Sequence, residues 1–219
     1  MSDVDAGERT PASALPDGFT VRLGRHTQIE DDGAVLIGGT GARVSRLTAS
    51  ARALVTDGTV TVRDAASRAL AEYLLENGFA NPVPDALPPI ALDRLTVVVP
   101  AKDRARLLGR LLASLPDGMA GVVVVDDGSD DPAAIADEAH AYGARLIVHP
   151  RNRGVSAARN SGLRAVETEF VAFIDTDVVM DDACLPLLLR HFADPRLALA
   201  APRVVGITEG RPNWITRYE

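Results

Sequence analysis

From about residue 95 onward, short runs of β-branched residues alternate with segments of helical spacing, and this alternation constrains the fold more than any other feature. The strands that it predicts cover residues 95–99, 121–125, 145–148 and 170–174. They are largely apolar along their whole length, and one helix separates each from the next. Such strands are typical of parallel sheets covered by helices on both faces. The sequence therefore predicts an α/β fold with a Rossmann-like, mostly parallel sheet over residues 94–219.

The first part of the chain has a different rhythm. Residues 1–18 are acidic and contain two prolines, so we expect a disordered tail. Residues 19–80 show two strand-like stretches, then two helical patterns and a helix stop at Asn77-Gly78, which predicts a small α+β, winged-helix-like recognition domain. Residues 81–93 contain four prolines and predict a stiff linker.

The composition excludes several classes of protein. Asp and Glu outnumber Lys and Arg by 30 to 23, and the net charge of −7 argues against a general nucleic-acid-binding protein. The sequence has one cysteine, Cys184, which excludes a disulfide framework and a multi-cysteine metal site. No apolar run approaches the roughly 20 residues of a membrane span, and the first residues lack the features of a secretory signal. We therefore expect a cytoplasmic location, with membrane association of the whole protein left open.

Acidic residues follow three of the four predicted strands. The first strand runs into Lys102 and Asp103, the second into Asp126 and Asp127, and the fourth into residues 175–177. Because ligands of a doubly wound sheet bind beyond the carboxyl ends of its strands, these groups should gather at one edge. They would repel one another there unless a cation or a donor-rich ligand were present. The pattern is typical of a site for a metal-bound phosphate compound.

The two aspartates after the fourth strand are candidate metal ligands. Asp175 and Asp177 are two residues apart in an extended stretch, so both carboxylates can point to the same side. Two hard oxygen ligands suit Mg²⁺ or Mn²⁺. The alternative is that the acidic residues here only cap the next helix, which explains Asp181 or Asp182 but not Asp175 at the strand tip.

Residues after the second and third strands are candidate nucleotide ligands. A carboxylate at Asp126 or Asp127 suits the N–H of a base or a ribose hydroxyl, although Asp-Gly-Ser is also an ordinary turn sequence. Residues 151–160 open a helix with three arginines and a glycine, and both helix-start amides and guanidinium groups favour phosphate. Arg159 lies one turn into this helix and is the better candidate, whereas Arg151 fits a solvated surface.

Two other features predict no site. The stretch Ile37–Gly41 is rich in glycine, but it lacks the spacing and the βαβ context of a dinucleotide-binding loop, so we interpret it as a β-turn. The histidines at 140, 149 and 191 are scattered along the chain and indicate no ligand cluster.

Four motifs in this order resemble those of family 2 glycosyltransferases of the GT-A fold. They are LTVVVPAKDR at Leu95–Arg104, VVVDDGS at Val123–Ser129, NRGVSAARNSG at Asn152–Gly162 and FIDTD at Phe173–Asp177. The resemblance covers about residues 94–206 and implies that a set of residues contacts a nucleotide: Pro100, Lys102, Asp103, Asp126, Asp127, Ser129, Asn152 and Arg159. It further implies uracil at Asp127 and a divalent cation, Mg²⁺ or Mn²⁺, at Asp175 and Asp177. The family more often has Asn where this chain has Asp103.

The front segment resembles the small peptide-binding winged-helix domain associated with quinone-cofactor peptide maturation. The two halves together resemble the glycosyltransferases of mycofactocin systems, which attach sugar to a peptide-derived redox cofactor. The implied reaction is transfer of a hexose, with glucose expected, from a UDP-sugar with inversion. The implied partner is a peptide-derived acceptor or precursor peptide held by residues 19–80.

The catalytic base of an inverting transferase is not evident in the sequence. This family needs a carboxylate to take the acceptor hydroxyl proton, well beyond the Asp-x-Asp pair. Residues 178–219 contain no matching Glu-Asp motif, so we expect an incomplete chain whose base lies beyond residue 219 and which turns over poorly. The alternative is a catalytically inert GT-A-like scaffold that binds a peptide or partner through its first module.

Overall fold

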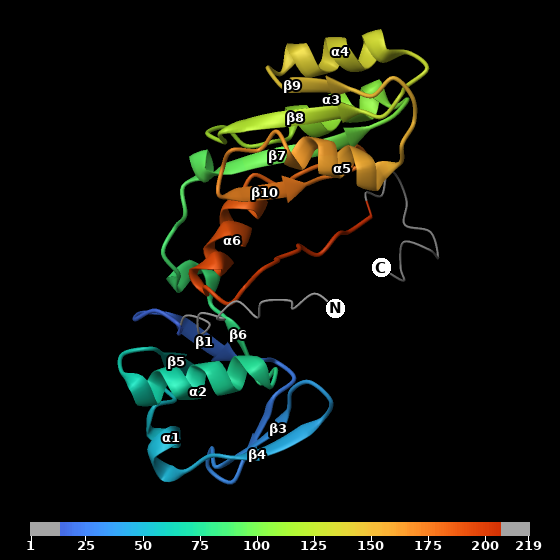
Figure 1. Cartoon of the computed structure of the whole chain (residues 1–219). Coiled ribbons are helices and arrows are strands. Elements are labelled where there is room, and N and C mark those ends of the chain that lie inside the picture. Colours follow the sequence, from blue (N-terminus) through green and yellow to red (C-terminus); the bar gives the residue numbers. More distant parts are fainter. Residues whose placement is uncertain (1–13, 207–219) are drawn as a thin grey trace, which may run out of the picture. The chain divides into compact units, whose positions relative to one another are not determined.

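The computed structural model describes residues 14–206 and divides into two compact units. One unit comprises residues 87–190. The other contains residues 14–86 together with the described residues from His191 onward, which include the 3₁₀ turn η3 (His191–Ala193). Each unit has its own sheets and helices (Figure 1).

The unit of residues 87–190 is an α/β structure with one four-stranded sheet. Its elements are η2 (Leu92–Arg94), β7 (Leu95–Ala101), α3 (Ala105–Ala113), β8 (Gly121–Asp126), α4 (Pro132–Ala141), β9 (Arg145–Val148), α5 (Val155–Leu163), β10 (Phe170–Phe173) and α6 (Cys184–Arg190). The strand order is β10-β7-β8-β9, and all three pairings are parallel. The predicted α/β fold with a mostly parallel sheet is confirmed.

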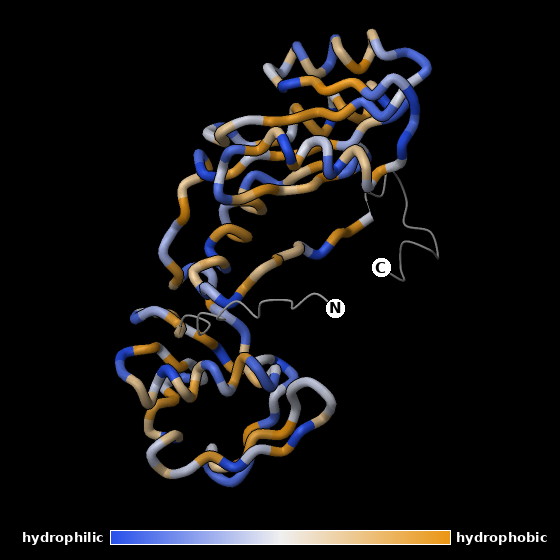
Figure 2. The backbone as a smooth tube through the Cα atoms, in the orientation of Figure 1, coloured by the Kyte–Doolittle hydropathy of each residue, from blue (hydrophilic) through white to orange (hydrophobic). Residues whose placement is uncertain are grey.

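Helices cover both faces of this sheet because successive strand residues point to opposite sides. In β7, Leu95, Val97 and Val99 pack with apolar residues of α3, α4 and α6. Val98 faces the other way and packs in a second cluster with residues of β8 and α5. Figure 2 shows these strands as the hydrophobic centre of the unit. Both faces are buried, which explains why the strands are apolar throughout.

Local sequence signals define the helix starts in this unit. The carboxylate of Asp131 accepts a hydrogen bond from the backbone N–H of Ala134 at 3.2 Å, and Pro132 occupies the first helical position of α4. This is the expected N-cap and first-turn pair. Gly162 lets α5 lie close to the sheet, because a Cβ there would come within 2.3 Å of Val98 Cγ1.

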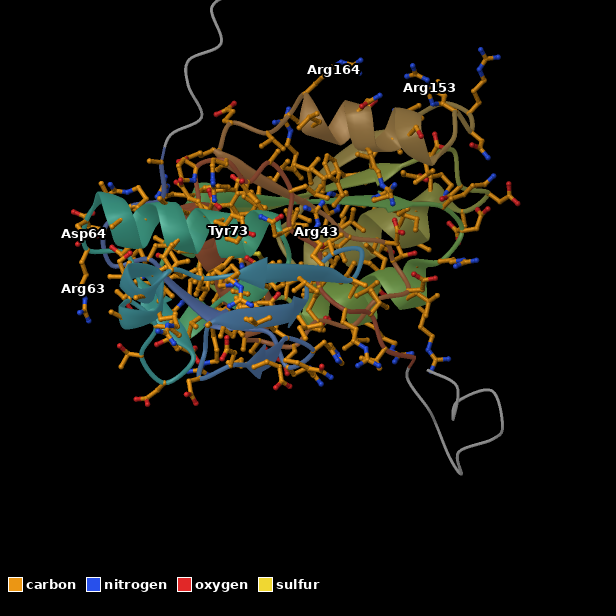
Figure 3. The ribbon with its side chains drawn as sticks, turned by 90° about the horizontal axis from the view of Figure 1, so that it is seen from below. Arg43, Arg63, Asp64, Tyr73, Arg153 and Arg164 are labelled. Carbon is orange, nitrogen blue, oxygen red and sulfur yellow. The ribbon has the colours of Figure 1, made fainter. Side chains whose placement is uncertain are left out.

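The other unit contains two small antiparallel sheets and two helices. Its elements are β1 (Thr20–Leu23), β2 (Gln28–Glu30), β3 (Val35–Gly38), β4 (Arg43–Arg46), α1 (Ala49–Ala53), β5 (Thr59–Thr61), α2 (Ala65–Glu76), β6 (Ala80–Pro82) and η1 (Pro84–Ala86). The sheets have the orders β5-β1-β6 and β2-β3-β4. Asp64, at the start of α2 in Figure 3, caps this helix by accepting from the Ser67 N–H at 2.8 Å. The winged-helix-like arrangement stays a prediction.

Two stretches of this unit bear on the sequence analysis. Residues 39–42 connect β3 to β4, which pair antiparallel, so the glycine-rich stretch is a hairpin turn and that interpretation is confirmed. Residues 80–82 form β6, paired with β1 in the register Val21↔Pro82, so the proline-rich stretch begins inside a sheet. Proline is tolerated there because β6 is an edge strand. Of the expected tail, residues 1–18, the first thirteen lie outside the described residues. Residues 14–18 differ from the expectation, because Leu15 is buried and its N–H donates to Glu72 Oε1 at 3.1 Å, and the Gly18 N–H donates to the Val62 carbonyl at 2.8 Å.

Candidate functional site

The carboxyl ends of the parallel strands open onto one cavity of about 610 Å³. It is lined by Pro100, Ala101, Lys102, Asp103, Arg104, Asp127, Asn152, Gly154, Val155, Ala158, Asp175, Thr176 and Asp177. Asp127 and the Asp175–Asp177 pair therefore face the same space, as the strand-end argument requires. Three of the residues expected to bind nucleotide, Asp126, Ser129 and Arg159, do not line it.

Asp127 follows β8 and is the most firmly held carboxylate in the cavity wall. Its Oδ1 accepts hydrogen bonds from His149 Nδ1 at 2.7 Å and from the Arg153 N–H at 2.9 Å, and its Oδ2 accepts from the Gly154 N–H at 2.7 Å. Burial by itself would raise the pKa of Asp127, but the hydrogen bonds from these three groups outweigh it and place the pKa below its usual value. Asp127 is therefore an ionised, oriented acceptor.

The loop before α5 supplies backbone groups to the site. Asn152 lines the cavity, and its Oδ1 accepts from the Gly154 N–H at 2.9 Å. The side chain of Arg153 points outward (Figure 3), so this residue serves Asp127 through its backbone N–H. The loop also lies against Gly128, where a Cβ would come within 2.5 Å of the Asn152 nitrogen.

Asp126 and Ser129 lie behind the cavity wall and fix the loop that follows β7. Asp126 is fully buried, and its Oδ1 accepts from the N–H and the hydroxyl of Ser129 at 3.0 and 2.5 Å. Ser129 Oγ in turn accepts from the Asp103 N–H at 2.9 Å. Neither side chain reaches the cavity lining, so Asp126 and Ser129 act on the site through the loops that they hold, and their contact with a nucleotide stays a prediction.

Asp103 links the loops after β7 and β8. Its backbone has φ +55°, and its Oδ1 accepts from the Asp130 N–H at 2.7 Å. Asn and Asp tolerate this left-handed conformation better than most residues. Asp103 therefore meets two requirements, a left-handed backbone conformation and an acceptor for the Asp130 N–H.

Two substitutions at Asp103, one that keeps both features and one that removes both, test this explanation. We expect Asp103→Asn to change the free energy of unfolding by less than about 0.5 kcal/mol, because the amide keeps both the backbone preference and an acceptor for Asp130. Asp103→Val should destabilise the chain by about 1–2 kcal/mol, because a β-branched residue is strained at positive φ. Urea denaturation followed by circular dichroism measures the difference. Equal effects of the two variants would contradict this explanation.

Asp175 and Asp177 stand beyond the end of β10, and each is paired with an arginine. Arg159 Nη2 on α5 lies 2.7 Å from Asp175 Oδ1, and Arg104 Nη1 lies 3.6 Å from Asp177 Oδ2. Both carboxylates are more than half exposed. Arg159 thus acts on the cavity through Asp175 rather than by lining it.

The donor set fits a hard divalent cation. Mg²⁺ is commonly bound by one or two carboxylates, with phosphate oxygens and water completing its shell, and Asp175 and Asp177 supply two carboxylates at the cavity wall. Within residues 14–206, no cluster of three or more His, Cys, Asp or Glu side chains could hold a metal ion. Phosphate oxygens and water are the groups that would complete the shell of a metal at this pair.

Sequence reasoning missed two residues of the site, Arg104, which lines the cavity, and His149, which contacts Asp127. His149 follows β9, its ring is almost fully buried, and it contacts Asp127 Oδ1 through Nδ1 and Ser161 Oγ through Nε2 at 2.9 Å. One signal could have indicated His149. His149 is the first residue after a strand of the same parallel sheet, as Asp127 is after β8.

Comparison with known protein families places this chain in one of them. The model of glycosyl transferase family 2 matches residues 96–219. This match covers more than half of the chain, and the chain belongs to glycosyl transferase family 2. No helix among residues 14–206 is long and apolar enough to cross a membrane.

One relative matches almost the whole chain. The pre-mycofactocin glycosyltransferase of Mycobacterium tuberculosis is 44% identical over 209 residues, which are 95% of this chain and 43% of that protein. The chain thus spans less than half the length of this relative.

Solved structures resemble part of the chain. A mannosyltransferase from Pyrobaculum calidifontis in complex with GDP-Man and Mn²⁺ has a TM-score of 0.45 and 29% identity, over 52% of this chain and 35% of that one. Glucosyl-3-phosphoglycerate synthase from Mycobacterium tuberculosis, with Mn²⁺, UDP and glucosyl-3-phosphoglycerate, has a TM-score of 0.38 and 27% identity, over 43% of this chain and 38% of that one.

Proposed function

We propose that this chain carries the donor half of a glycosyltransferase that moves a hexose, with glucose as first candidate, from a UDP-sugar to a mycofactocin-like redox cofactor. The observation that carries the proposal is the shared cavity of Asp127 and the Asp175–Asp177 pair. Membership of family 2 supports the reaction class, and the name of the 44%-identical relative supports the acceptor.

The nucleotide base is assigned to the Asp127 end of the cavity. Each carboxylate oxygen can accept about two hydrogen bonds. Oδ1 has two donors and Oδ2 has one, so one acceptor position of Oδ2 is left for a ligand. The imide N–H of uracil is a suitable donor.

The diphosphate is assigned to the charged cavity residues other than Asp127, namely the Asp175–Asp177 pair with Lys102 and Arg104. Asp175 and Asp177 would hold Mg²⁺ or Mn²⁺, and Lys102 and Arg104 line the same cavity. When bound, the cation would neutralise negative charge on the diphosphate leaving group. The protein's own cations add to this, because a guanidinium or ammonium group stabilises phosphate oxygens through charge-assisted hydrogen bonds.

Inversion at the sugar carbon requires a carboxylate that accepts the proton of the acceptor hydroxyl. Each acidic side chain among the described cavity residues already has another part in this proposal. Asp127 binds the nucleobase, Asp103 holds its loop, and Asp175 and Asp177 bind the cation. We therefore assign the role of catalytic base to none of these four aspartates.

The peptide part of the acceptor is assigned to residues 19–80. An extended peptide can add a strand to an exposed sheet edge. In the sheet β2-β3-β4, β4 is an edge strand, with Arg43 and Arg46 exposed and Val44 71% exposed. This edge offers backbone pairing, one apolar contact and two cationic side chains to an extended precursor peptide.

The proposal is tested by calorimetric titration of the whole 219-residue chain with UDP, with and without Mn²⁺. We expect one UDP per chain and binding at least about tenfold tighter with Mn²⁺, because a cation held by Asp175 and Asp177 would offset the negative charge of the diphosphate. GDP serves as the comparison nucleotide. Absence of binding heat under both conditions would instead favour the inert scaffold.

A further inference from the structure

Asp127 is held in one orientation by a buried chain of polar groups. The side chain of Asp127 is 7% exposed and that of His149 is 5% exposed. The His149 backbone is fixed as well, because its N–H donates to the Asp126 carbonyl at 2.8 Å. The imidazole therefore spans from the end of β9 to Ser161 on α5 and has little freedom to turn.

The hydrogen-bond chemistry defines the tautomer of this histidine. An ionised carboxylate can only accept, so His149 Nδ1 must carry the hydrogen that is shared with Asp127 Oδ1. In the neutral ring, Nε2 then accepts from the Ser161 hydroxyl. The carboxylate of Asp127 therefore selects this tautomer, and the Ser161 hydroxyl, which can donate to Nε2, gives the ring a second partner and fixes its orientation.

We propose that His149, oriented by Ser161, is a positioning residue that sets the base preference of the cavity by saturating Asp127 Oδ1 and leaving Oδ2 as the one acceptor for a ligand. The inference rests on the proposed binding of a uridine nucleotide. A ring that presents N–H at this point gains a charge-assisted hydrogen bond. A ring that presents a bare nitrogen, as cytosine does, places a lone pair against an ionised carboxylate.

Removal of His149 should loosen the orientation of the Asp127 carboxylate and make its ionised form less favourable. The histidine hydrogen bond is one of the interactions that lower the pKa of Asp127. Without it, the carboxylate can rotate and becomes easier to protonate, and a protonated Asp127 can donate to a bare ring nitrogen. UDP affinity should therefore fall while CDP affinity falls little or rises.

The test measures dissociation constants of UDP and CDP at saturating Mn²⁺ for the whole chain and its variants. We expect His149→Leu to weaken UDP binding about ten- to hundredfold and to reduce the UDP-to-CDP preference by a similar factor. His149→Asn should lose less, because its amide nitrogen can replace Nδ1 as the donor. Ser161→Ala should cost a few-fold. His140→Leu, at an exposed histidine of α4, is the matched control and should leave both constants unchanged.

The outcomes separate this inference from the proposed function. If the natural chain fails to bind UDP, both the proposed function and the positioning inference are overturned. If it binds UDP and His149→Leu lowers UDP and CDP affinity equally, or neither, His149 has a structural role alone and the positioning inference is overturned. Should His149→Leu fail to fold, His149→Asn and Ser161→Ala decide, since retention of the full base preference by both would overturn it.

Discussion

Asp175→Asn is expected to remove metal-dependent UDP binding, with Mn²⁺ affinity in the presence of UDP reduced at least about 100-fold. Loss of a group that only supports a metal ligand typically costs 10–100-fold, and loss of the ligand itself should cost no less. The substitution also leaves Arg159 facing a neutral amide instead of the carboxylate oxygen that it now contacts at 2.7 Å. Asp177→Asn should have a similar effect. Calorimetry with Mn²⁺ and UDP measures both.

Asp182→Asn is the matched control for these variants. Asp182 is an exposed acidic residue a few positions later that does not line the cavity. The Asp182→Asn variant removes the same charge from the same region but changes no residue of the cavity lining. It should therefore leave the metal dependence of UDP binding within about twofold of that of the natural chain. If both cavity variants kept the metal-dependent heat, Asp175 and Asp177 would not be the metal ligands.

The second large effect is expected at Gly128, where the loop after β8 meets the loop before α5. Its φ is +72°, and an added Cβ would lie 2.5 Å from both the Arg151 carbonyl carbon and the Asn152 nitrogen. These neighbours are backbone atoms, which cannot avoid the added Cβ by changing rotamer as a side chain could. We expect Gly128→Ala to lower the free energy of unfolding by about 2–5 kcal/mol, the sum of left-handed strain and overpacking. UDP affinity should fall with it, because the loop carries the N–H groups that hold Asp127.

Gly143→Ala separates strain from contact. Gly143 lies in the turn between α4 and β9 with φ +66°, and no neighbouring atom would lie within 4 Å of a Cβ. This variant should cost only the strain of about 1–2 kcal/mol and should leave UDP affinity unchanged. Urea denaturation of the two variants gives the comparison. Equal losses of stability would show that the approach of the two loops does not matter.

The α/β unit could be predicted from sequence because its signals are local. β7 and β8 are runs of β-branched residues buried on both faces, and Asp131-Pro132 starts α4 through contacts within four residues. Because parallel strands end at one carboxyl edge of a sheet, the strand assignment alone predicts that Asp127 and Asp175 lie close together. These features depend on periodicity and capping, which a single sequence carries.

The partners of these carboxylates could not be predicted in the same way. The contact between Asp127 and His149 depends on the register that sets Asp126 opposite Val148 in the β8–β9 pair. Nothing in the residues themselves fixes that register. Similarly, Asp126 and Asp127 are identical in type and adjacent in sequence, and only the structure shows that one is fully buried behind the wall while the other lines the cavity.

The first unit was harder to predict because its strands are short. β2, β5 and β6 have three residues each, and all three residues of β2 are exposed. A strand of this length shows no clear alternation of polar and apolar residues. Its pairing is decided by neighbours that are distant in sequence, as when β1 pairs with both β5 and β6.

The edge strand β6 has a consequence for self-association. An unpaired strand edge is a template on which another chain can extend a sheet, and proline interrupts that template because it has no N–H to donate. Pro82 ends β6, and Pro84 follows two residues later. The β6 edge of the sheet β5-β1-β6 is therefore protected against pairing with strands of other chains. Replacing Pro82 by a β-branched residue would make this edge prone to aggregation.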